Sequence, residues 1–423
     1  MTVATARLDA PWLSARPLAD LLDVLDGDGE EARINGGAVR DALIGDAIGD
    51  IDVATTALPE ETARRAEKAG WKVAPTGIEH GTVTVIIKGH PFEVTTLRRD
   101  VSTDGRRATV AFTRNWAEDA ARRDLTINGL YLSRDGMVHD HVGGLEDLAV
   151  RRVRFIGDAR QRIREDFLRT LRFFRFHARF AEGAPDAEGF SAAIAEREGL
   201  RRLSAERVRA ELLKLLVARR ATETVADMAG AGLFAPLVGG VPRPSRLASL
   251  AEIDADAPDA LLRLAALLQF TDEDAARLKE RLRLSNAEAL RLAAIGDLTP
   301  RLVPGMGETA AKVALYRLGP HAFGDRARLA WADAGRDASA QEWETLVTLP
   351  DRWEPPKLPV SAADLISRGM APGPELGRAL RAIEAAWIDA GFPTETAEVD
   401  VLIEKASSRP ERSAEPGSSS EEG

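Results

Sequence analysis

Two short stretches near the start of the chain carry residue types suited to phosphate chemistry. The stretch 35–41 (NGGAVRD) contains a glycine pair, and Gly49-Asp50-Ile51-Asp52 follows it. A glycine-lined turn lets backbone N–H groups approach a phosphate, while carboxylates at alternate strand positions project from one face and can share a divalent metal ion. The combination predicts nucleotidyl transfer, with Asp50 and Asp52 as catalytic residues and metal ligands.

A third carboxylate and an arginine pair extend this hypothesis. Glu93, between Phe92 and Val94, is the candidate for a third catalytic carboxylate from a neighbouring strand, and a surface strand glutamate is an equal alternative. In the stretch 122–128 (RRDLTIN), two guanidinium groups precede an acid and an amide. Such a set suits triphosphate oxygens and ribose hydroxyls, although a salt-bridged helix end would look the same.

The charge of the chain is unevenly distributed. The net charge over 423 residues is −10, which argues at first against a nucleic-acid partner. From Arg151 to Phe180, however, ten arginines face three acidic residues, and this local excess favours a polyanion. There is no cysteine, so thiol chemistry and zinc-thiolate sites are excluded. Neither a leader pattern nor a membrane-spanning apolar run is present, and we expect a cytoplasmic protein.

The apolar pattern changes along the chain. The stretches 81–88 and 92–97 predict strands and 60–69 predicts a helix, so the first part reads as an α/β head. From residue 159 onward the spacing of Leu and Phe is helical. Proline and glycine clusters at 236–244 and 350–359 suggest boundaries between helical modules.

Several motifs resemble those of the class II tRNA nucleotidyltransferases, which include the bacterial CCA-adding enzymes and belong to the DNA polymerase beta-like superfamily. The motifs are GGAVRDALIG with GDIDVATTA, RRDLTINGL, DHVGGLEDL, EDFLRTLRFFRF and LSAERVRAEL, within residues 33–212. The resemblance implies an α+β fold: a polymerase beta-like nucleotidyltransferase head, with a small mixed sheet and helices, then an all-α neck, body and tail. The expected divisions are a helical lead-in (1–32), the head (33–150), a neck with base recognition (151–236), a body (237–350), an RNA-binding tail (351–406) and a disordered tail (407–423).

The resemblance also implies roles for single residues. Gly36, Gly37 and Arg40 would contact nucleotide phosphates, Arg123 and Asp124 would hold triphosphate and ribose, and Asp50 and Asp52 would bind Mg²⁺. A helix over 165–176 would carry the base-reading set, which is Asp166, Arg169, Arg172 and Arg175.

The spacing of the base-reading set has its own physical reading. Steps of three residues keep these side chains on one side of a helix and place Asp166 beside Arg169. An acceptor beside a donor fits the pairing edges of cytosine and adenine and rejects uracil and guanine. An ordinary ion pair between helical neighbours is the alternative. Between the catalytic strand and the arginine pair, the polar stretch 98–108 predicts a mobile loop, which in the family is needed to switch from C to A addition.

The expected function is template-independent addition or repair of the 3′-terminal CCA of tRNA from CTP and ATP. The alternatives are a bacterial poly(A) polymerase, an enzyme that adds only the terminal A, and a non-catalytic RNA-binding protein. The expected partners are tRNA, CTP and ATP, with no membrane, and the chain would be a monomer or dimer. Because only His321 follows His177, we expect no histidine-aspartate hydrolase domain.

Overall fold

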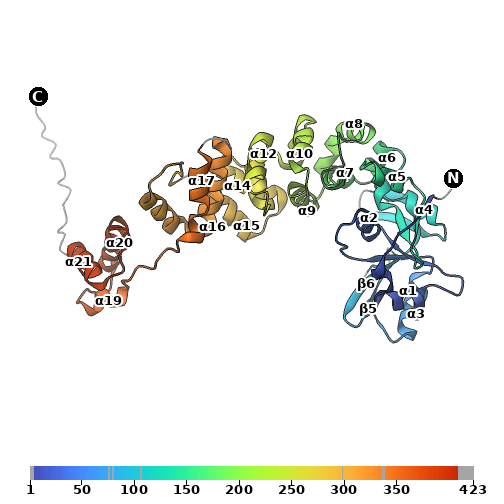
Figure 1. Ribbon diagram of the computed structural model, residues 1–423, viewed down its shortest axis with the longest axis horizontal. Helices are drawn as coiled ribbons and strands as arrows, with labels where there is room; N and C mark the ends of the chain where they lie inside the picture. The colour runs from blue at the N-terminus through green and yellow to red at the C-terminus, as the bar shows by residue number, and fades with distance from the viewer. Residues whose placement is uncertain are drawn as a thin grey trace, which may run out of the picture. The chain divides into compact units, whose positions relative to one another are not determined.

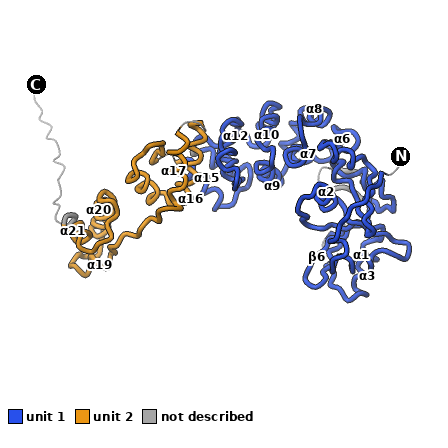
Figure 2. The backbone as a smooth tube through the Cα atoms, viewed as in Figure 1, with its two compact units in different colours: residues 1–296 blue, residues 297–423 orange. Residues whose placement is uncertain are grey.

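The chain folds into two compact units, residues 1–296 and 297–423 (Figure 2). The computed structural model describes residues 4–74, 77–78, 81–104, 107–297, 299–335 and 339–407. The predicted disordered tail from residue 407 therefore falls, except for its first residue, outside the described residues. The finer division into head, neck, body and tail stays a prediction.

The first unit begins with a mixed sheet of eight strands, in the order β1-β10-β9-β2-β3-β6-β5-β4. Its neighbours pair antiparallel except β3 and β6, which run parallel. Strands β7 and β8 form a separate antiparallel pair. The strands are β1 Ala4–Arg7, β2 Ala32–Asn35, β3 Asp52–Thr55, β4 Lys72–Ala74, β5 Thr82–Ile87, β6 His90–Thr96, β7 Arg98–Asp104, β8 Arg107–Phe112, β9 Leu130–Leu132 and β10 Met137–Asp140.

Short helices accompany this sheet in the N-terminal, blue to teal part of the chain (Figure 1). The α-helices are α1 Leu18–Leu25, α2 Gly37–Ile44, α3 Pro59–Lys68, α4 Trp116–Ala121 and α5 Gly144–Ala149, and the 3-10 helices are η1 Pro11–Ser14 and η3 Thr126–Asn128. Helix α1 buries four leucines at helical spacing, and strand β5 buries every second residue. The strands predicted over 81–88 and 92–97 and the helix predicted over 60–69 are confirmed as β5, β6 and α3, and the alternation in β5 explains the first of them.

Two expectations for the first part of the chain are wrong in their secondary structure. The lead-in over 1–32 contains a strand as well as helices, because Ala4–Arg7 pairs with β10 at the edge of the sheet. The stretch 98–108, expected to be a loop, forms most of the β7–β8 pair, while residues 105–106 lie outside the described residues. Although the composition of this stretch is typical of loops, the backbone of β7 pairs with that of β8 and forms a strand pair.

From α6 onward the described part of the first unit is helical. Helix α7 buries all of its Leu and Phe side chains and packs against α9 and α10. The helices are α6 Ala159–Glu165, α7 Leu168–Phe180, α8 Ala187–Ala195, η4 Arg197–Arg202, α9 Ala205–Leu216, α10 Ala221–Gly230, α11 Phe234–Val238, α12 Pro244–Ile253, α13 Ala260–Leu268, α14 Asp272–Leu282 and α15 Asn286–Gly296.

Helices are the regular secondary structure of the second unit in its described residues. Trp387 is 1% exposed and packs with Phe392 and Tyr316, so it belongs to the core as its residue type predicts. No described helix is long and apolar enough to cross a bilayer. The helices are α16 Glu308–Ala334, with a kink at Gly319, α17 Ala340–Val347, α18 Leu349–Arg352, α19 Ala362–Ser367, α20 Pro374–Asp389 and α21 Thr396–Ser407.

Candidate active site

The predicted catalytic carboxylates meet at the start of strand β3. Asp52 is the first residue of this strand, and the parallel pairing places it opposite Glu93 of β6. Asp50 precedes the strand, so only one of the two aspartates lies on it. Asp52 is exposed at the surface, yet the protein atoms around its carboxylate remove part of its hydration, and this partial burial raises its pKa. The negative charges of Glu93 and Asp50 raise the pKa further, and Arg123 lowers it.

The raised pKa of Asp52, caused first by burial and then by the negative charges of Glu93 and Asp50, is the observation that bears on a metal ion. A bound cation would offset both effects, and Asp and Glu oxygens are ligands for hard divalent ions. Among the described residues no group of three or more His, Asp or Glu side chains is close enough to enclose a metal. The carboxylates of Asp50, Asp52 and Glu93 are thus of the chemical type that could hold a divalent ion.

The glycine pair forms the turn from strand β2 into helix α2. Gly36 has φ 68°, a conformation that L side chains rarely adopt, and its carbonyl accepts from the Arg40 amide. No side chain caps the first turn of α2. Its backbone N–H groups and the positive end of its dipole therefore suit a phosphate, as the sequence predicts. A Cβ on Gly36 would lie 3.6 Å from Nη1 of Arg123, so this turn and that arginine are neighbours.

Arg123 is held in place by a buried carboxylate that the sequence analysis missed. Asp119, on α4, is 1% exposed and forms ion pairs with Arg122 (2.8 Å) and Arg123 (3.1 Å). It also accepts hydrogen bonds from the Tyr131 hydroxyl (2.7 Å) and the Arg98 amide (3.2 Å). Although burial acts in the opposite direction, these cations and hydrogen bonds lower the pKa of Asp119 to about 2. Arg123 donates further to the side chain of Asn35 (2.8 Å).

Asp124 connects the stretch 122–128 to helix α7. It is 9% exposed and accepts from the Leu125 amide (2.9 Å) and the Asn128 side chain (3.2 Å). Nε of Arg172, on α7, lies 2.5 Å from its other oxygen. Arg172 and hydrogen bonding lower the pKa of Asp124 against the effect of burial. Asp124, predicted to hold triphosphate and ribose, and Arg172, predicted to read the base, are thus in direct contact.

The predicted helix over 165–176 is interrupted at its second residue. Asp166 has φ −154° and ψ 108°, and its side chain accepts from the amide of Leu168 (3.1 Å) at the start of α7. Its other oxygen binds Arg207 of α9 (2.6 Å). The expectation that Asp166 lies beside Arg169 on one helix is therefore wrong. Arg169 is ion-paired with Glu165, and Arg175 with Glu211.

The arginine-rich stretch 151–180 is largely neutralised within the protein. Nine of its ten arginines have an acidic partner. Most of these acids lie outside the stretch, which is why a local charge count overstated its free positive charge. The pairs are Arg152 and Arg154 with Asp147, Arg160 and Arg164 with Glu196, Arg162 and Arg169 with Glu165, Arg172 with Asp124, Arg175 with Glu211, and Arg179 with Asp41 and Asp46.

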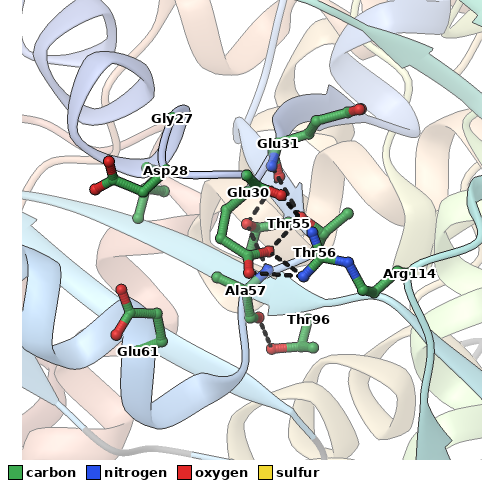
Figure 3. Close-up of polar contacts among 12 residues, drawn as sticks. Gly27, Asp28, Glu30, Glu31, Thr55, Thr56, Ala57, Glu61, Thr96 and Arg114 are labelled. Carbon is green, nitrogen blue, oxygen red and sulfur yellow. Dashed lines mark hydrogen bonds and ion pairs between the residues drawn. The ribbon is translucent and has the colours of Figure 1, made fainter.

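The chain leaving strand β8 is fixed to the segment that precedes β2, next to the end of β3 (Figure 3). Arg114 donates to both carboxylate oxygens of Glu30, at 2.6 and 2.8 Å, and to the carbonyl of Gly29. Thr56 donates to the same carboxylate (2.5 Å), and Arg114 lowers the pKa of Glu30 against the effect of burial. The β7–β8 pair thus returns to the sheet at a defined point.

Sequence reasoning missed the acids and the arginine that hold the predicted residues. Asp119 stands four residues before Arg123, a spacing that brings side chains together on a helix and could have indicated it. Arg207 and Glu211 have the same spacing within the LSAERVRAEL motif. Nothing in the local sequence pairs them with Asp166 and Arg175, because those contacts join α9 to the α6–α7 region.

Comparison with known proteins agrees with this arrangement. The chain matches the family models "Poly A polymerase head domain" over residues 32–154 and "Probable RNA and SrmB- binding site of polymerase A" over residues 186–242. It is 34% identical over 411 residues to mouse mitochondrial CCA tRNA nucleotidyltransferase 1, covering 95% of this chain and 93% of that protein. It is 32% identical over 391 residues to a CCA-adding enzyme of Lactobacillus delbrueckii subsp. bulgaricus, covering 89% and 93%.

A solved structure extends the similarity to three dimensions. The Bacillus stearothermophilus CCA-adding enzyme in complex with CTP superposes with a TM-score of 0.70 at 29% identity, over 91% of this chain and 96% of that one. The predicted fold class, a polymerase beta-like head followed by helices, is confirmed. With its mixed sheet, its glycine turn and a full-length relative above 30% identity, the chain belongs to the CCA-adding tRNA nucleotidyltransferase family.

Proposed function

We propose that this enzyme adds or repairs the 3′-terminal CCA of tRNA without a nucleic-acid template, using CTP and ATP. The observation that carries the proposal is the contact between Asp124 and Arg172. It joins the turn suited to triphosphate and ribose to the helix suited to reading a base, so one nucleotide can meet both. Relatives named for CCA addition and a relative solved with CTP support the substrates.

The reaction is an in-line displacement. The 3′-hydroxyl of tRNA attacks the α-phosphate of the nucleotide, a new P–O bond forms, and the bond to the β-phosphate breaks with release of pyrophosphate. Asp50 and Asp52, with Glu93 beside them, would hold Mg²⁺, which when bound supplies positive charge to the attacking and leaving oxygens. The open first turn of α2 at Gly36 and Gly37 receives phosphate oxygens.

The remaining proposed residues orient the nucleotide. Arg123, fixed by Asp119 and Asn35, presents guanidinium donors to the triphosphate, and Asp124 accepts from the ribose. The base-reading set, Asp166, Arg169, Arg172 and Arg175, offers acceptors and donors to the pairing edge of cytosine or adenine. Since each of these side chains has a protein partner in the free enzyme, nucleotide binding exchanges some of those contacts.

The proposal is tested with the full-length protein and labelled tRNA that ends at the discriminator base. With CTP alone we expect two added nucleotides, and with CTP and ATP three. Growth beyond three residues with ATP alone would instead identify a poly(A) polymerase, the activity for which the head-domain family is named. Addition only of a terminal A to tRNA ending in CC would identify an A-adding enzyme. Binding without any incorporation would favour a non-catalytic RNA-binding protein.

Two aspartate substitutions, one at a proposed metal ligand and one away from it, test the role of the carboxylates. Asp52→Asn removes a proposed metal ligand, and incorporation should fall by at least about 100-fold because charge stabilisation of the reacting oxygens is lost. Asp135→Asn changes an aspartate of the same unit that binds Ser133 and the Met137 amide, and it should leave the rate unchanged. Cytoplasmic location and a monomeric or dimeric state remain predictions.

A further inference from the structure

The C-terminal end of helix α4 is covered by two arginines of the neighbouring helices α6 and α7. Nη2 of Arg162 donates to the carbonyl of Ala121 (2.8 Å), and Nη2 of Arg169 donates to the carbonyl of Arg122 (3.4 Å). The last carbonyls of a helix have no partner within the helix, so positively charged donors stabilise them. The two arginines thus hold the helix end that leads into the stretch 122–128.

Both arginines also share one carboxylate. One oxygen of Glu165, the last residue of α6, accepts from Nη1 of Arg162 (2.9 Å) and from Nη1 of Arg169. The other oxygen accepts from the side chain of Gln161 (3.4 Å). The three charged side chains are 18%, 15% and 14% exposed for Arg162, Glu165 and Arg169. One negative charge therefore lies between two positive charges, in surroundings that screen charge less than water does.

Arg162 is the firmly held member of the pair. Each nitrogen of its guanidinium has an acceptor, because Nε donates to the carbonyl of Ile156 (3.1 Å) in addition to the bonds from Nη1 and Nη2. These acceptors lie on α6, at the end of α4 and in the segment between α5 and α6. Arg169 reaches the end of α4 through a longer hydrogen bond, which is weaker.

The proposed function requires Arg169 to leave this cluster in part. Arg169 is proposed to read the base, and a guanidinium that donates to a base edge gives up donors that it now offers to Glu165 and to backbone carbonyls. A largely buried carboxylate that loses its cation is costly. Because Arg162 donates to the same oxygen of Glu165, that carboxylate keeps a positive partner when Arg169 turns away.

We propose that Arg162 is a positioning residue for the base-reading arginine: it holds Glu165 in place and neutralised, so that Arg169 can turn to the base. This inference rests on the proposed function. Without Arg162, Glu165 would bind Arg169 more tightly and keep it from the base. The preference among bases would then fall, although no residue proposed to touch the nucleotide has changed.

The experiment measures base preference on the full-length enzyme, as kcat/KM for CTP relative to UTP with tRNA that ends at the discriminator base. Both values come from one protein preparation, so an unfolded fraction of the enzyme cancels in the ratio. Arg162→Met keeps most of the side-chain length and removes the charge. We expect base preference to fall by about tenfold, because Arg169 then stays with Glu165.

A double-mutant cycle separates this role from support of the helix end. Glu165→Gln keeps the size of the side chain and removes the charge that Arg162 is proposed to balance. In that background Arg162→Met should change base preference by less than about twofold, because the two residues act through one interaction. Equal falls in both backgrounds would show that Arg162 only supports α4 and would overturn the inference. An unchanged preference in the single variant would overturn it as well.

Arg164→Met is the matched control on the same helix. Arg164 is 57% exposed and pairs with Glu196, so base preference should stay at the wild-type value. Melting curves show whether Arg162→Met is folded. Should it not fold, Arg162→Gln, which keeps a donor but not the charge, replaces it in the same cycle with the same expected results. If the wild-type enzyme incorporates neither CTP nor ATP, the proposed function is wrong, and this outcome is separate from any result with the variants.

Discussion

Asp119 is the buried carboxylate that the two arginines of the candidate site share. With a pKa of about 2 it stays charged at any pH at which the enzyme would work, so its partners keep one arrangement. Arg123 could otherwise adopt several rotamers on a long, flexible side chain. A fixed acceptor reduces the conformational entropy that is lost when a triphosphate binds.

Asp119→Asn tests this role. The amide keeps the size of the side chain but removes the charge, so the half-buried guanidinium groups of Arg122 and Arg123 lose the negative charge that compensates them. We expect a loss of about 3 kcal/mol in the free energy of unfolding and a rise of about tenfold in KM for CTP. Denaturant titration and steady-state kinetics measure the two effects. Tyr131→Phe is the control: it removes one hydrogen bond to the same carboxylate and the hydroxyl that accepts from Nε of Arg123 (3.2 Å), but it keeps the charge of Asp119 and should change both quantities less.

His177 provides a prediction about pH. It is 1% exposed on α7, and burial, with the charge of Arg220, lowers its pKa to about 4. The unfolded chain therefore binds this proton at a higher pH than the folded chain, and stability falls as the pH drops from about 6.5 towards about 4. Glu223 acts in the opposite direction and is the weaker influence.

His177→Leu should remove this dependence. Between about pH 7.5 and about pH 6 the wild type should lose on the order of 1 kcal/mol of unfolding free energy that the variant retains. Urea titrations of both proteins at the two pH values give the difference, in which the other titrating groups cancel. Parallel losses in the two proteins would show that His177 is not the group responsible.

Helix α5 packs so closely on η3 that a glycine is required between them. A Cβ on Gly144 would lie 2.3 Å from the carbonyl oxygen of Thr126, in the turn that carries the arginine-rich motif. Gly144→Ala should therefore displace η3, cost at least about 2 kcal/mol in unfolding free energy and slow nucleotide incorporation. Gly230→Ala, at the end of α10 with open space around it, should be neutral or stabilise by up to about 1 kcal/mol.

Helices and strands could be predicted from the sequence where their apolar residues recur at a regular spacing. The alternation in β5 and the strand around Glu93 are examples, and the expectation that Glu93 lies on a strand next to that of Asp52 is confirmed by the register of the two residues. The break at Asp166 was missed because the continuous helical pattern of the sequence gives no sign that the Asp166 side chain accepts from the Leu168 amide. The burial of Arg40 was missed because its aromatic partners lie on α7, a distant helix that no local pattern connects to α2.

At the scale of the whole molecule, two compact units predict unfolding in more than one step. Trp387 packs within residues 297–423, and its Nε1 donates to the Pro393 carbonyl (2.8 Å). Trp387→Ala should remove about 3 to 5 kcal/mol from the second unit and lower the temperature of one calorimetric transition only. Val401→Ala, at a side chain 47% exposed in the same unit, is the control. A uniform shift of the entire transition would show that the two units unfold together.

The paired arginines of the stretch 151–180 affect how the enzyme would respond to ionic strength. Each guanidinium that turns towards an RNA phosphate must leave a carboxylate of its own protein, and that carboxylate then gathers sodium or potassium ions from the solution. Cations freed from the RNA are thus partly taken up again by the protein. The affinity for tRNA should therefore weaken less steeply with added salt than the number of arginines alone would suggest.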